Sequence, residues 1–355
     1  SILNNQSPPF GTAQDNSSPA KNTFINTINI CCMKFVPSSS KTACLFSIIF
    51  LLAAANSFAQ ELYPVKLSNK LWHDTELELR YKPDGTDFVI INGNRLFTRA
   101  LYGTHTAFRV ETGDRPEFAL YMPGMGGNFK LGIGANGKTK WLTAANKITA
   151  RYRPGARLYT IEDSRLGKAS LQIEILALAD AEGFVIKTKC INLSKPIDLY
   201  WAFGGATGKK FSRDGDMGPD PESVFYLTPE NCKDNKYKLD EKGKFVLNYG
   251  SGLQAGADGR YFIEDTNQAA KPTKEQQLNG MFAPEALVKI GDASHLSSPA
   301  ELYGSNAYKA PVLVGKLIIN NAQENYFSIY NPATKRAISY NQLRTVFKQP
   351  ETAKQ

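Results

Sequence analysis

Apolar and polar residues alternate along most of this chain, and that alternation restricts its fold more than any other feature. Apolar Leu171, Ile173 and Ile175, for example, alternate with Gln172 and Glu174. Successive side chains of a strand point to opposite faces, so such a segment has one buried and one wet face. Helical periodicity is scarce. We therefore expect an all-β fold, a large antiparallel β-sandwich of the supersandwich type with few short helices.

Turn residues separate the segments that carry the strand pattern. Pro154-Gly155 suits a tight turn between two strands, because proline sets the first central angle and glycine accepts a positive φ. Asn92-Gly93 predicts a tight hairpin that joins Asp87–Ile91 to Arg95–Phe97. About a dozen strands joined by hairpins are expected. Those beyond the first hairpin cover residues 147–153, 157–163, 171–177, 184–191, 199–203, 311–320 and 326–330.

Two long stretches interrupt the strand pattern and are expected to be loops. Residues 204–222 are rich in Gly, Asp and Lys, and residues 265–283 are polar, with Lys, Gln and Pro. Long irregular loops on a rigid scaffold commonly carry binding residues. Both stretches are therefore places to look for a functional site.

Residues 33–59 have the pattern of a secretory signal peptide. Basic Lys34 precedes an apolar run from Ala43 to Ala55, and small residues then occupy both positions that a signal peptidase reads. A membrane anchor of that length would reach only about 20 Å, short of the ~30 Å hydrocarbon core. We expect cleavage near Ala59, a periplasmic or secreted protein, and no membrane insertion after cleavage.

The expected domain layout follows from these segments. Residues 1–32 begin with Ser1 and lack a hydrophobic pattern, so an untranslated or disordered lead is expected there. The β-sandwich domain is expected over 60–339. In the tail 340–355, Leu343 and its apolar neighbours have helical spacing, and we expect the start of a linker to a missing C-terminal module.

Charge and cysteine content exclude some classes of protein. The formal charge of +9 is spread along the chain, and with export this argues against a nucleic-acid partner. Cys190 and Cys232 are the cysteines left after signal cleavage. An oxidising compartment permits them to pair, but two cysteines make no disulfide framework. A disulfide, or one buried thiol and one loop thiol, both stay open.

Glycine-rich strings resemble nucleotide-binding motifs only in part. Gly124-Met125-Gly126-Gly127 lacks the third glycine of a dinucleotide loop, where Phe129 stands, and a strand-like segment follows instead of a helix. Gly208-Lys209-Lys210 lacks the hydroxyl residue of a phosphate loop. Both strings are interpreted as turns between strands, and no cofactor is expected from them.

Common catalytic patterns are missing from the sequence. No Gly-x-Ser-x-Gly nucleophile motif is present. His73, His105 and His295 are far apart and have no zinc-like spacing, so a structural hydrogen-bonding role is favoured for each. No catalytic residue is therefore assigned.

The loop 204–222 holds the metal candidates. Asp214, Asp216 and Asp220 supply oxygen ligands at alternating positions, as a Ca²⁺ loop does. The calcium-loop pattern is incomplete, so a solvated loop that pairs with Lys210 and Arg213 is the alternative. Ca²⁺ at these three aspartates is therefore one hypothesis, and the solvated loop is the other.

Candidate contacts to a glycan come from aromatic and basic residues. Trp141 borders a Gly/Lys turn, where an exposed indole could stack on a sugar ring, and Lys210 and Arg213 supply donors. Trp201 lies in an apolar strand and is expected in the core.

Five strings of the sequence carry a resemblance to a known bacterial family. These strings are Asn94–Thr104, Phe108–Phe118, Met122–Asn128, Ala150–Gly155 and Phe211–Asp216. Together they resemble the family called domain of unknown function 4450. The resemblance implies a secreted polysaccharide-utilisation protein, in which a β-sandwich precedes an (α/α)-barrel module similar to glycoside hydrolases in longer members. It implies no catalytic residue for the sandwich.

The resulting interpretation is an N-terminal β-sandwich of a secreted carbohydrate-active protein. Its expected partners are a polysaccharide or oligosaccharide and a helical-barrel catalytic module in the same polypeptide, against which it packs. A free-standing carbohydrate-binding module is the first alternative, and an exposed row of aromatic residues would favour it. A sandwich epimerase or lyase is the second, and it needs a cluster of acid and base side chains in one cleft.

Overall fold

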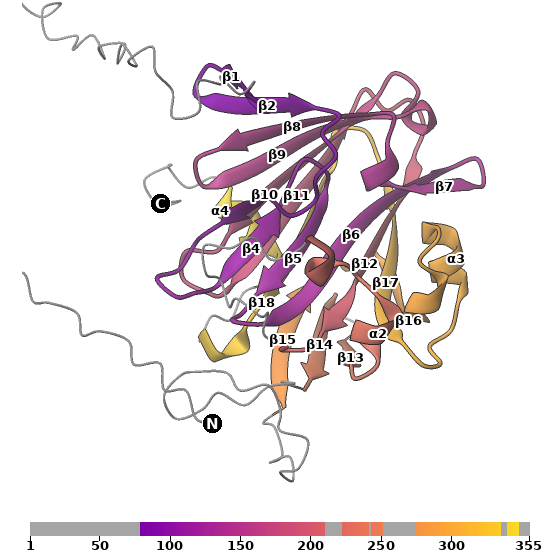
Figure 1. The fold of residues 1–355 in the computed structure, drawn as a ribbon. Coiled ribbons are helices and arrows are strands. Elements are labelled where there is room, and N and C mark those ends of the chain that lie inside the picture. Colours follow the sequence, from indigo (N-terminus) through magenta and orange to yellow (C-terminus); the bar gives the residue numbers. More distant parts are fainter. Residues whose placement is uncertain (1–78, 210–221, 241–242, 251–274, 335–338, 348–355) are drawn as a thin grey trace, which may run out of the picture. The chain divides into compact units, whose positions relative to one another are not determined.

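The computed structural model describes residues 79–209, 222–240, 243–250, 275–334 and 339–347. These residues lie in one compact unit, Leu77–Gln355. The expected lead 1–32 and signal peptide 33–59 fall outside the described residues. Two large antiparallel sheets make up the unit, and the expected all-β sandwich is confirmed (Figure 1).

The first sheet has ten strands in the order β1-β2-β8-β9-β10-β11-β18-β15-β14-β13. Consecutive strands β8 to β11 are joined as hairpins, whereas β18 comes from the far end of the chain. Their bounds, in sheet order, are Lys82–Asp84, Asp87–Ile91, Lys147–Arg153, Ala156–Glu162, Ser170–Ala177, Gly183–Ile191, Glu324–Tyr330, Gln276–Met281, Lys244–Tyr249 and Lys236–Asp240.

The second sheet has eight strands in the order β16-β17-β12-β6-β5-β4-β3, with β7 paired to β6. In that order the bounds are Leu287–Asp292, Pro311–Ile319, Ile197–Ala206, Met125–Ala135, Glu117–Tyr121, Arg109–Thr112, Arg99–Leu101 and, for β7, Lys138–Trp141. The described helices are short: α2 (Pro229–Cys232), α3 (Pro299–Gly304), α4 (Tyr340–Val346) and the 3-10 turns η1 (Leu142–Ala144), η2 (Ser164–Leu166), η3 (Glu222–Phe225), η4 (Ala293–His295) and η5 (Pro332–Thr334).

The main core lies between the two sheets, because alternate residues of nearly every strand point inward. Trp201 of β12 is 1% exposed, as expected from its apolar strand. Its ring stacks on Phe129 at 6.0 Å and meets Phe327 of the other sheet edge-on at 5.8 Å. Aromatic rings thus hold the two sheets together at the centre.

The short helices α2 and α3 pack on the outer face of the eight-stranded sheet. Each has a proline in its first turn and a hydroxyl residue as its N-cap, Thr228 for α2 and Ser298 for α3. A Cβ on Gly132 would lie 2.6 Å from Pro299 Cγ, so only glycine lets α3 approach β6 this closely. This face therefore buries a second apolar cluster and offers little open surface.

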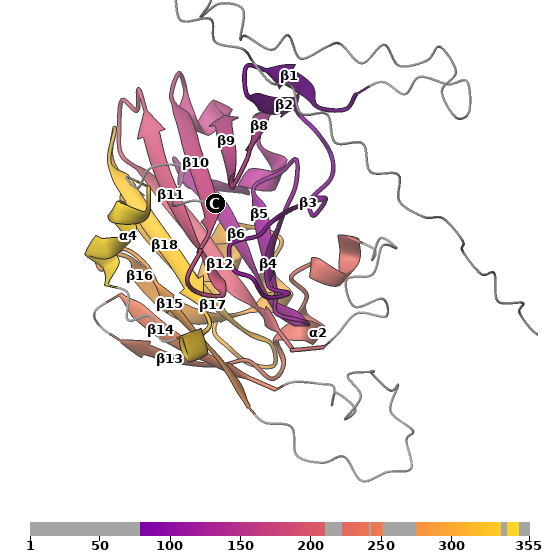
Figure 2. The same ribbon diagram turned by 90° about the vertical axis from the view of Figure 1, so that its left-hand side faces the viewer.

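Helix α4 packs on the outer face of the ten-stranded sheet, beside β18 and β11 (Figure 2). Its helical spacing is confirmed, and Leu343 is fully buried. The backbone N–H of Tyr326 donates to Tyr340 Oη at 3.1 Å. The apolar side of α4 faces the sheet, so Leu343 and its apolar neighbours pack with the sandwich.

The hairpin expected at Asn92-Gly93 is wrong. Strand β2 pairs with β1 and β8 instead of residues 95–97. Asn92 adopts a left-handed φ of 51°, and its N–H donates to Ile148 O at 2.8 Å. A Cβ on Gly93 would lie 2.4 Å from Asp114 Oδ2. The pair therefore marks where the chain leaves one sheet for the other.

Both expected loops are shorter than their sequence suggests. Strand β12 continues to Ala206, and β15 occupies residues 276–281 inside the second stretch. Strand β15 was not expected from the sequence, because most of its side chains are polar. Its Leu278 is nevertheless fully buried. A Cβ on Gly280 would lie 2.0 Å from Phe245 Cε1, so the strand must have glycine where this ring crosses it. Residues 210–221 and 251–274 lie outside the described part.

Cys190 and Cys232 are both free and buried. Cys190 lies between the sheets, whereas Cys232 is the last residue of α2 and packs on the outer side of the eight-stranded sheet. Burial raises the pKa of Cys190 to about 11 and that of Cys232 to about 12. The two cysteines do not form a disulfide, and the expected loop thiol is instead a buried residue of a helix.

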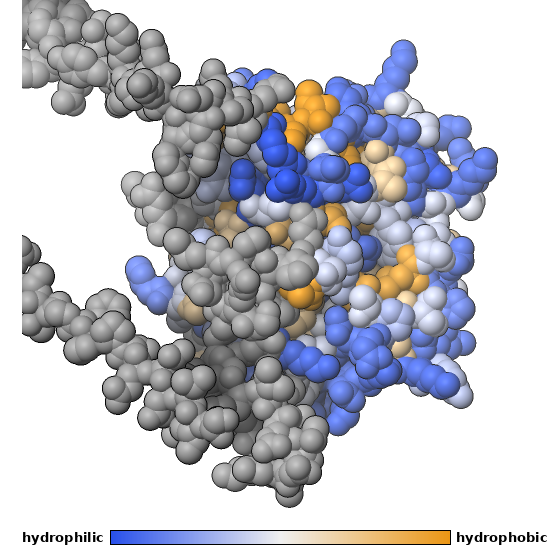
Figure 3. Space-filling view, viewed as in Figure 1, coloured by the Kyte–Doolittle hydropathy of each residue, from blue (hydrophilic) through white to orange (hydrophobic). Residues whose placement is uncertain are grey.

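The coloured part of the face seen in Figure 3 is mostly hydrophilic, with small and separate hydrophobic patches. Exposed large apolar side chains are spread over different strands, for example Phe88, Leu287 and Ile318. Within the described ranges, every helix falls short of the length and apolar content that a membrane crossing requires.

Candidate functional site

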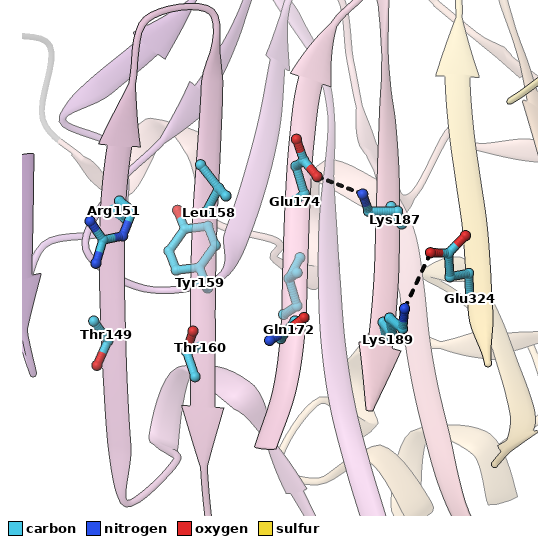
Figure 4. Close-up of a pocket in the computed structure, with 11 residues that line it drawn as sticks. Thr149, Arg151, Leu158, Tyr159, Thr160, Gln172, Glu174, Lys187, Lys189 and Glu324 are labelled. Atoms are coloured by element: carbon cyan, nitrogen blue, oxygen red, sulfur yellow. Dashed lines mark ion pairs between the residues drawn. The ribbon is translucent and has the colours of Figure 1, made fainter. Parts of the chain in front are cut away.

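A hollow of about 310 Å³ lies on the outer face of the ten-stranded sheet, across β8, β9, β10, β11 and β18. We call it the sheet hollow. Most of the side chains that line it stand on the sheet in two rows that run across the strands (Figure 4). Helix α4 borders it, because Lys187 of the hollow lies 4.5 Å from the ring centre of Phe347.

The first row is polar over its whole length. It consists of Thr149, Thr160, Gln172, Lys189 and Glu324, one residue from each of the five strands. Each residue is the direct cross-strand partner of the next. Direct partners on one face have neighbouring side chains, so the row forms a continuous line of hydrogen-bonding groups.

The second row mixes apolar and charged groups. It consists of Arg151, Leu158, Glu174, Lys187 and Tyr326, again as direct partners. Lys187 Nζ lies 2.7 Å from Glu174 Oε2, and Arg151 pairs outside the hollow with Asp84 at 2.8 Å and Asp87 at 3.3 Å. The charged members of this row are therefore engaged with other protein groups.

Hydrogen bonding is much less complete in the first row. Among the described residues, the side chains of Thr149, Thr160 and Gln172 have no hydrogen-bond partner within the protein. Lys189 Nζ has an ion pair with Glu324 at 3.6 Å, which exceeds a hydrogen-bond distance. These groups can hydrogen-bond to water or to a ligand with hydroxyl groups.

Glu324 is the carboxylate of the hollow whose pKa is shifted by its neighbours. Tyr326 Oη donates to Glu324 Oε2 at 2.7 Å, and this bond, with nearby Lys189, Lys187 and Arg344, lowers the pKa of Glu324. Glu174 is paired with Lys187. A glycosidase needs a carboxylic acid with a raised pKa to protonate the leaving group. The lowered pKa of Glu324 therefore does not fit the role of that acid.

Most site residues expected from the sequence lie outside the described part. These are the metal candidates Asp214, Asp216 and Asp220 and the glycan candidates Lys210 and Arg213. Within the described ranges, no three His, Cys, Asp or Glu side chains gather in a way that would hold a metal ion. The calcium hypothesis stays a prediction for the acidic loop.

The expected exposure of Trp141 is wrong. Its side chain is 8% exposed, and its Nε1 donates to Leu296 O at 2.7 Å. Segment 293–304 covers it from a distant part of the chain, and Lys130 lies 5.7 Å from the ring centre. Its ring face is therefore not presented to a sugar.

Two histidines fall in the described part. His105 is exposed in a loop and His295 is exposed at the end of η4, and neither lines the sheet hollow. His73 lies outside the described residues. The cluster of acid and base side chains that an epimerase or lyase requires is not formed by these histidines at the hollow.

The charged string 108–118 builds the fold instead of a cleft. Buried Asp114 accepts hydrogen bonds from Tyr81 Oη and, at 2.6 Å, from Arg80. Fully buried Arg157 donates to Gly113 O at 2.7 Å. The hydrogen bonds of Asp114 hold Arg80 and Tyr81, at the start of the described chain, against the sandwich.

Sequence reasoning identified Gln172 and Glu174 as wet positions but not as parts of a site. Period-two alternation predicts which face a residue occupies, and the outward positions of β8 to β11 are readable in this way. The order of strands in the sheet is not, so the row that ends at Glu324 could not be assembled.

The fold and the sheet hollow define an antiparallel β-sandwich protein with a polar hollow on the outer face of one sheet. The chain belongs to the family described as Domain of unknown function (DUF4450), whose model matches residues 122–351. The family expected from the sequence strings is thereby confirmed, and both rows of the hollow lie inside the matched range. A search of the curated proteins finds no match.

Proposed function

We propose that this protein is an exported, non-catalytic β-sandwich that holds a glycan in the sheet hollow and serves a helical-barrel catalytic module of the same polypeptide. The first row carries this proposal. Sugars present many hydroxyl groups, and a line of unused hydroxyl, amide and ammonium groups matches them in number and kind. Export is supported by the signal-peptide pattern in 33–59.

The fixed scaffold under the row favours binding. Side chains on paired strands are positioned more firmly than side chains on loops, so less freedom is lost when a ligand binds. The proposed module would stand beside the hollow if it follows α4, because Phe347 and Arg344 border the hollow. The helical-barrel partner itself rests on the family resemblance.

Glycan binding is tested with the purified exported protein on an array of host, plant and microbial polysaccharides. We expect binding without release of reducing ends. Gln172→Leu should weaken it about tenfold, the effect of losing one or two hydrogen bonds at a ligand. Gln277→Leu is the matched control, since Gln277 is exposed on β15 of the same sheet and lies outside the hollow.

Two results would contradict the proposal. Equal loss of binding in both glutamine variants would place the glycan elsewhere. Turnover by the parent protein that disappears in Glu174→Gln would make the sandwich an enzyme, and the epimerase, lyase or hydrolase reading would replace the binding module.

A further inference from the structure

Positive charge exceeds negative charge at the β11–β18 end of the first row. Glu324 is the carboxylate that faces both Lys189, at 3.6 Å, and Arg344, at 3.9 Å. Its Oε2 also accepts the hydrogen bond from Tyr326 Oη at 2.7 Å. The carboxylate of Glu324 is therefore shared by Lys189 and Arg344, and neither cation forms a short hydrogen bond with it.

Lys189 is the most available of the cations in the hollow. Lys187 has Glu174 at 2.7 Å, and Arg151 has Asp84 at 2.8 Å. The ammonium of Lys189 has three donors, and among the described residues its ion pair with Glu324 is its only polar contact from a side chain. Its side chain is 33% exposed, so a ligand can reach it.

We propose that the ligand of the sheet hollow is an acidic oligosaccharide that lies across the strands, with a carboxylate of one sugar bound to Lys189. This inference rests on the proposed glycan-binding function and adds the class of glycan and its direction. A carboxylate next to Lys189 forms a short charge-assisted hydrogen bond, which the 3.6 Å contact with Glu324 does not supply.

The direction follows from the spacing of the groups. Across the strands, the row presents a polar side chain at every strand, about 4.8 Å apart, and spans roughly 19 Å from β8 to β18. Along one strand, side chains of the same face are about 6.6 Å apart and soon leave the hollow. Thr149, Thr160 and Gln172 thus meet hydroxyl groups of successive sugars, while Lys189 binds the acidic unit.

The probes are oligogalacturonates from the dimer upward and the same oligomers with every carboxyl methyl-esterified. Esterification removes the charge and leaves the ring and the linkage unchanged. Calorimetric titration of the exported full chain is expected to show binding of the acid and about tenfold weaker binding of the ester. Affinity for the acid should fall as salt is added, since the contact is between charges.

Lys189→Met tests the position of the carboxylate. This variant is expected to lose about tenfold in affinity for the acid and to bind the ester as the parent does. Lys238→Met is the matched control, because Lys238 is an exposed lysine on β13 of the same sheet, away from the hollow. It should bind both probes unchanged.

Thr149→Val tests the direction, since Thr149 stands at the opposite end of the row. Long oligomers should be weakened by Thr149→Val and by Lys189→Met, whereas the dimer should respond to Lys189→Met alone. A glycan that ran along β10 or β11 would respond to Lys189→Met and ignore Thr149→Val at every length, and the crossing direction would be wrong.

The remaining outcomes separate this inference from the function on which it rests. Equal binding of acid and ester, or binding of neutral oligosaccharides alone, would overturn the acidic ligand and keep the glycan-binding site. Binding of no acidic or neutral glycan at all would overturn both.

Discussion

At the scale of single residues, buried charge is used to hold loops in place. Asp292 is 4% exposed, and its Oδ2 accepts the backbone N–H groups of Tyr308 at 3.0 Å, Lys309 at 2.8 Å and Ala310 at 3.2 Å. Its Oδ1 accepts from Ser294 Oγ at 2.6 Å. Burial raises the pKa of Asp292, but these hydrogen bonds outweigh it and hold the pKa below the usual range.

Asp292→Asn is therefore expected to lower the free energy of unfolding at pH 7 by about 2–3 kcal/mol. The asparagine would replace one carboxylate oxygen by an NH2 group, and that group would face hydrogen-bond donors instead of accepting from them. The folded-state pKa of Asp292 is depressed. Its contribution is then present above the unfolded value, about 3.9, and is lost as the pH falls through the folded value.

Urea unfolding at pH 7 and at lower pH measures this difference. The gap between parent and Asp292→Asn should narrow below about pH 4. Asp198→Asn is the control, because Asp198 is 31% exposed in an ion pair with Lys316 and should cost less than about 1 kcal/mol. A gap that stays constant with pH would mean that the charge of Asp292 does not stabilise this loop.

At the scale of elements, α4 shows how a short helix depends on its docking. The helix spans Tyr340–Val346, too short to be stable alone in water, and a capping box at Ser339 and Gln342 satisfies its first turn. Leu343 fills an apolar cluster on the outer face of the ten-stranded sheet. The helix therefore depends on packing against the sheet, to which Leu343 contributes its fully buried side chain.

Leu343→Ala is expected to lower the free energy of unfolding by about 2–3 kcal/mol, because it leaves a cavity in that cluster. Thr345→Ala, on the exposed side of the same helix, should change stability by no more than about 0.5 kcal/mol. Thermal unfolding of the two variants compares them. Equal stabilities would mean that α4 belongs to a linker, as the sequence had led us to expect.

At the scale of the whole molecule, the two sheets share one core and should unfold together. Trp201 reports on that core, where it contacts Phe129 of its own sheet and Phe327 of the other. We expect tryptophan fluorescence and far-ultraviolet circular dichroism to give coincident unfolding curves, the sign of one cooperative transition. Two separated transitions would show that one sheet survives without the other.

The sequence by itself determined the class of fold and many of its strands. The turn at Pro154-Gly155 is found where it was expected, with a φ of 77° at Gly155. Strands β10, β11, β17 and β18 lie within a residue or two of their predicted bounds. These features depend on neighbours in the chain, since the angles of a turn and the period of a strand are local properties.

Only the tertiary structure decided which strands pair and which polar surfaces stay open. Asn92-Gly93 has the composition of a hairpin turn, but β2 pairs with β1 and β8 instead of with the residues that follow the turn. Trp141 borders a turn, yet a segment more than a hundred residues later buries it. The first row joins Thr149 to Glu324 through four strand pairings. Such contacts arise from packing between distant segments, which a local pattern of residues does not encode.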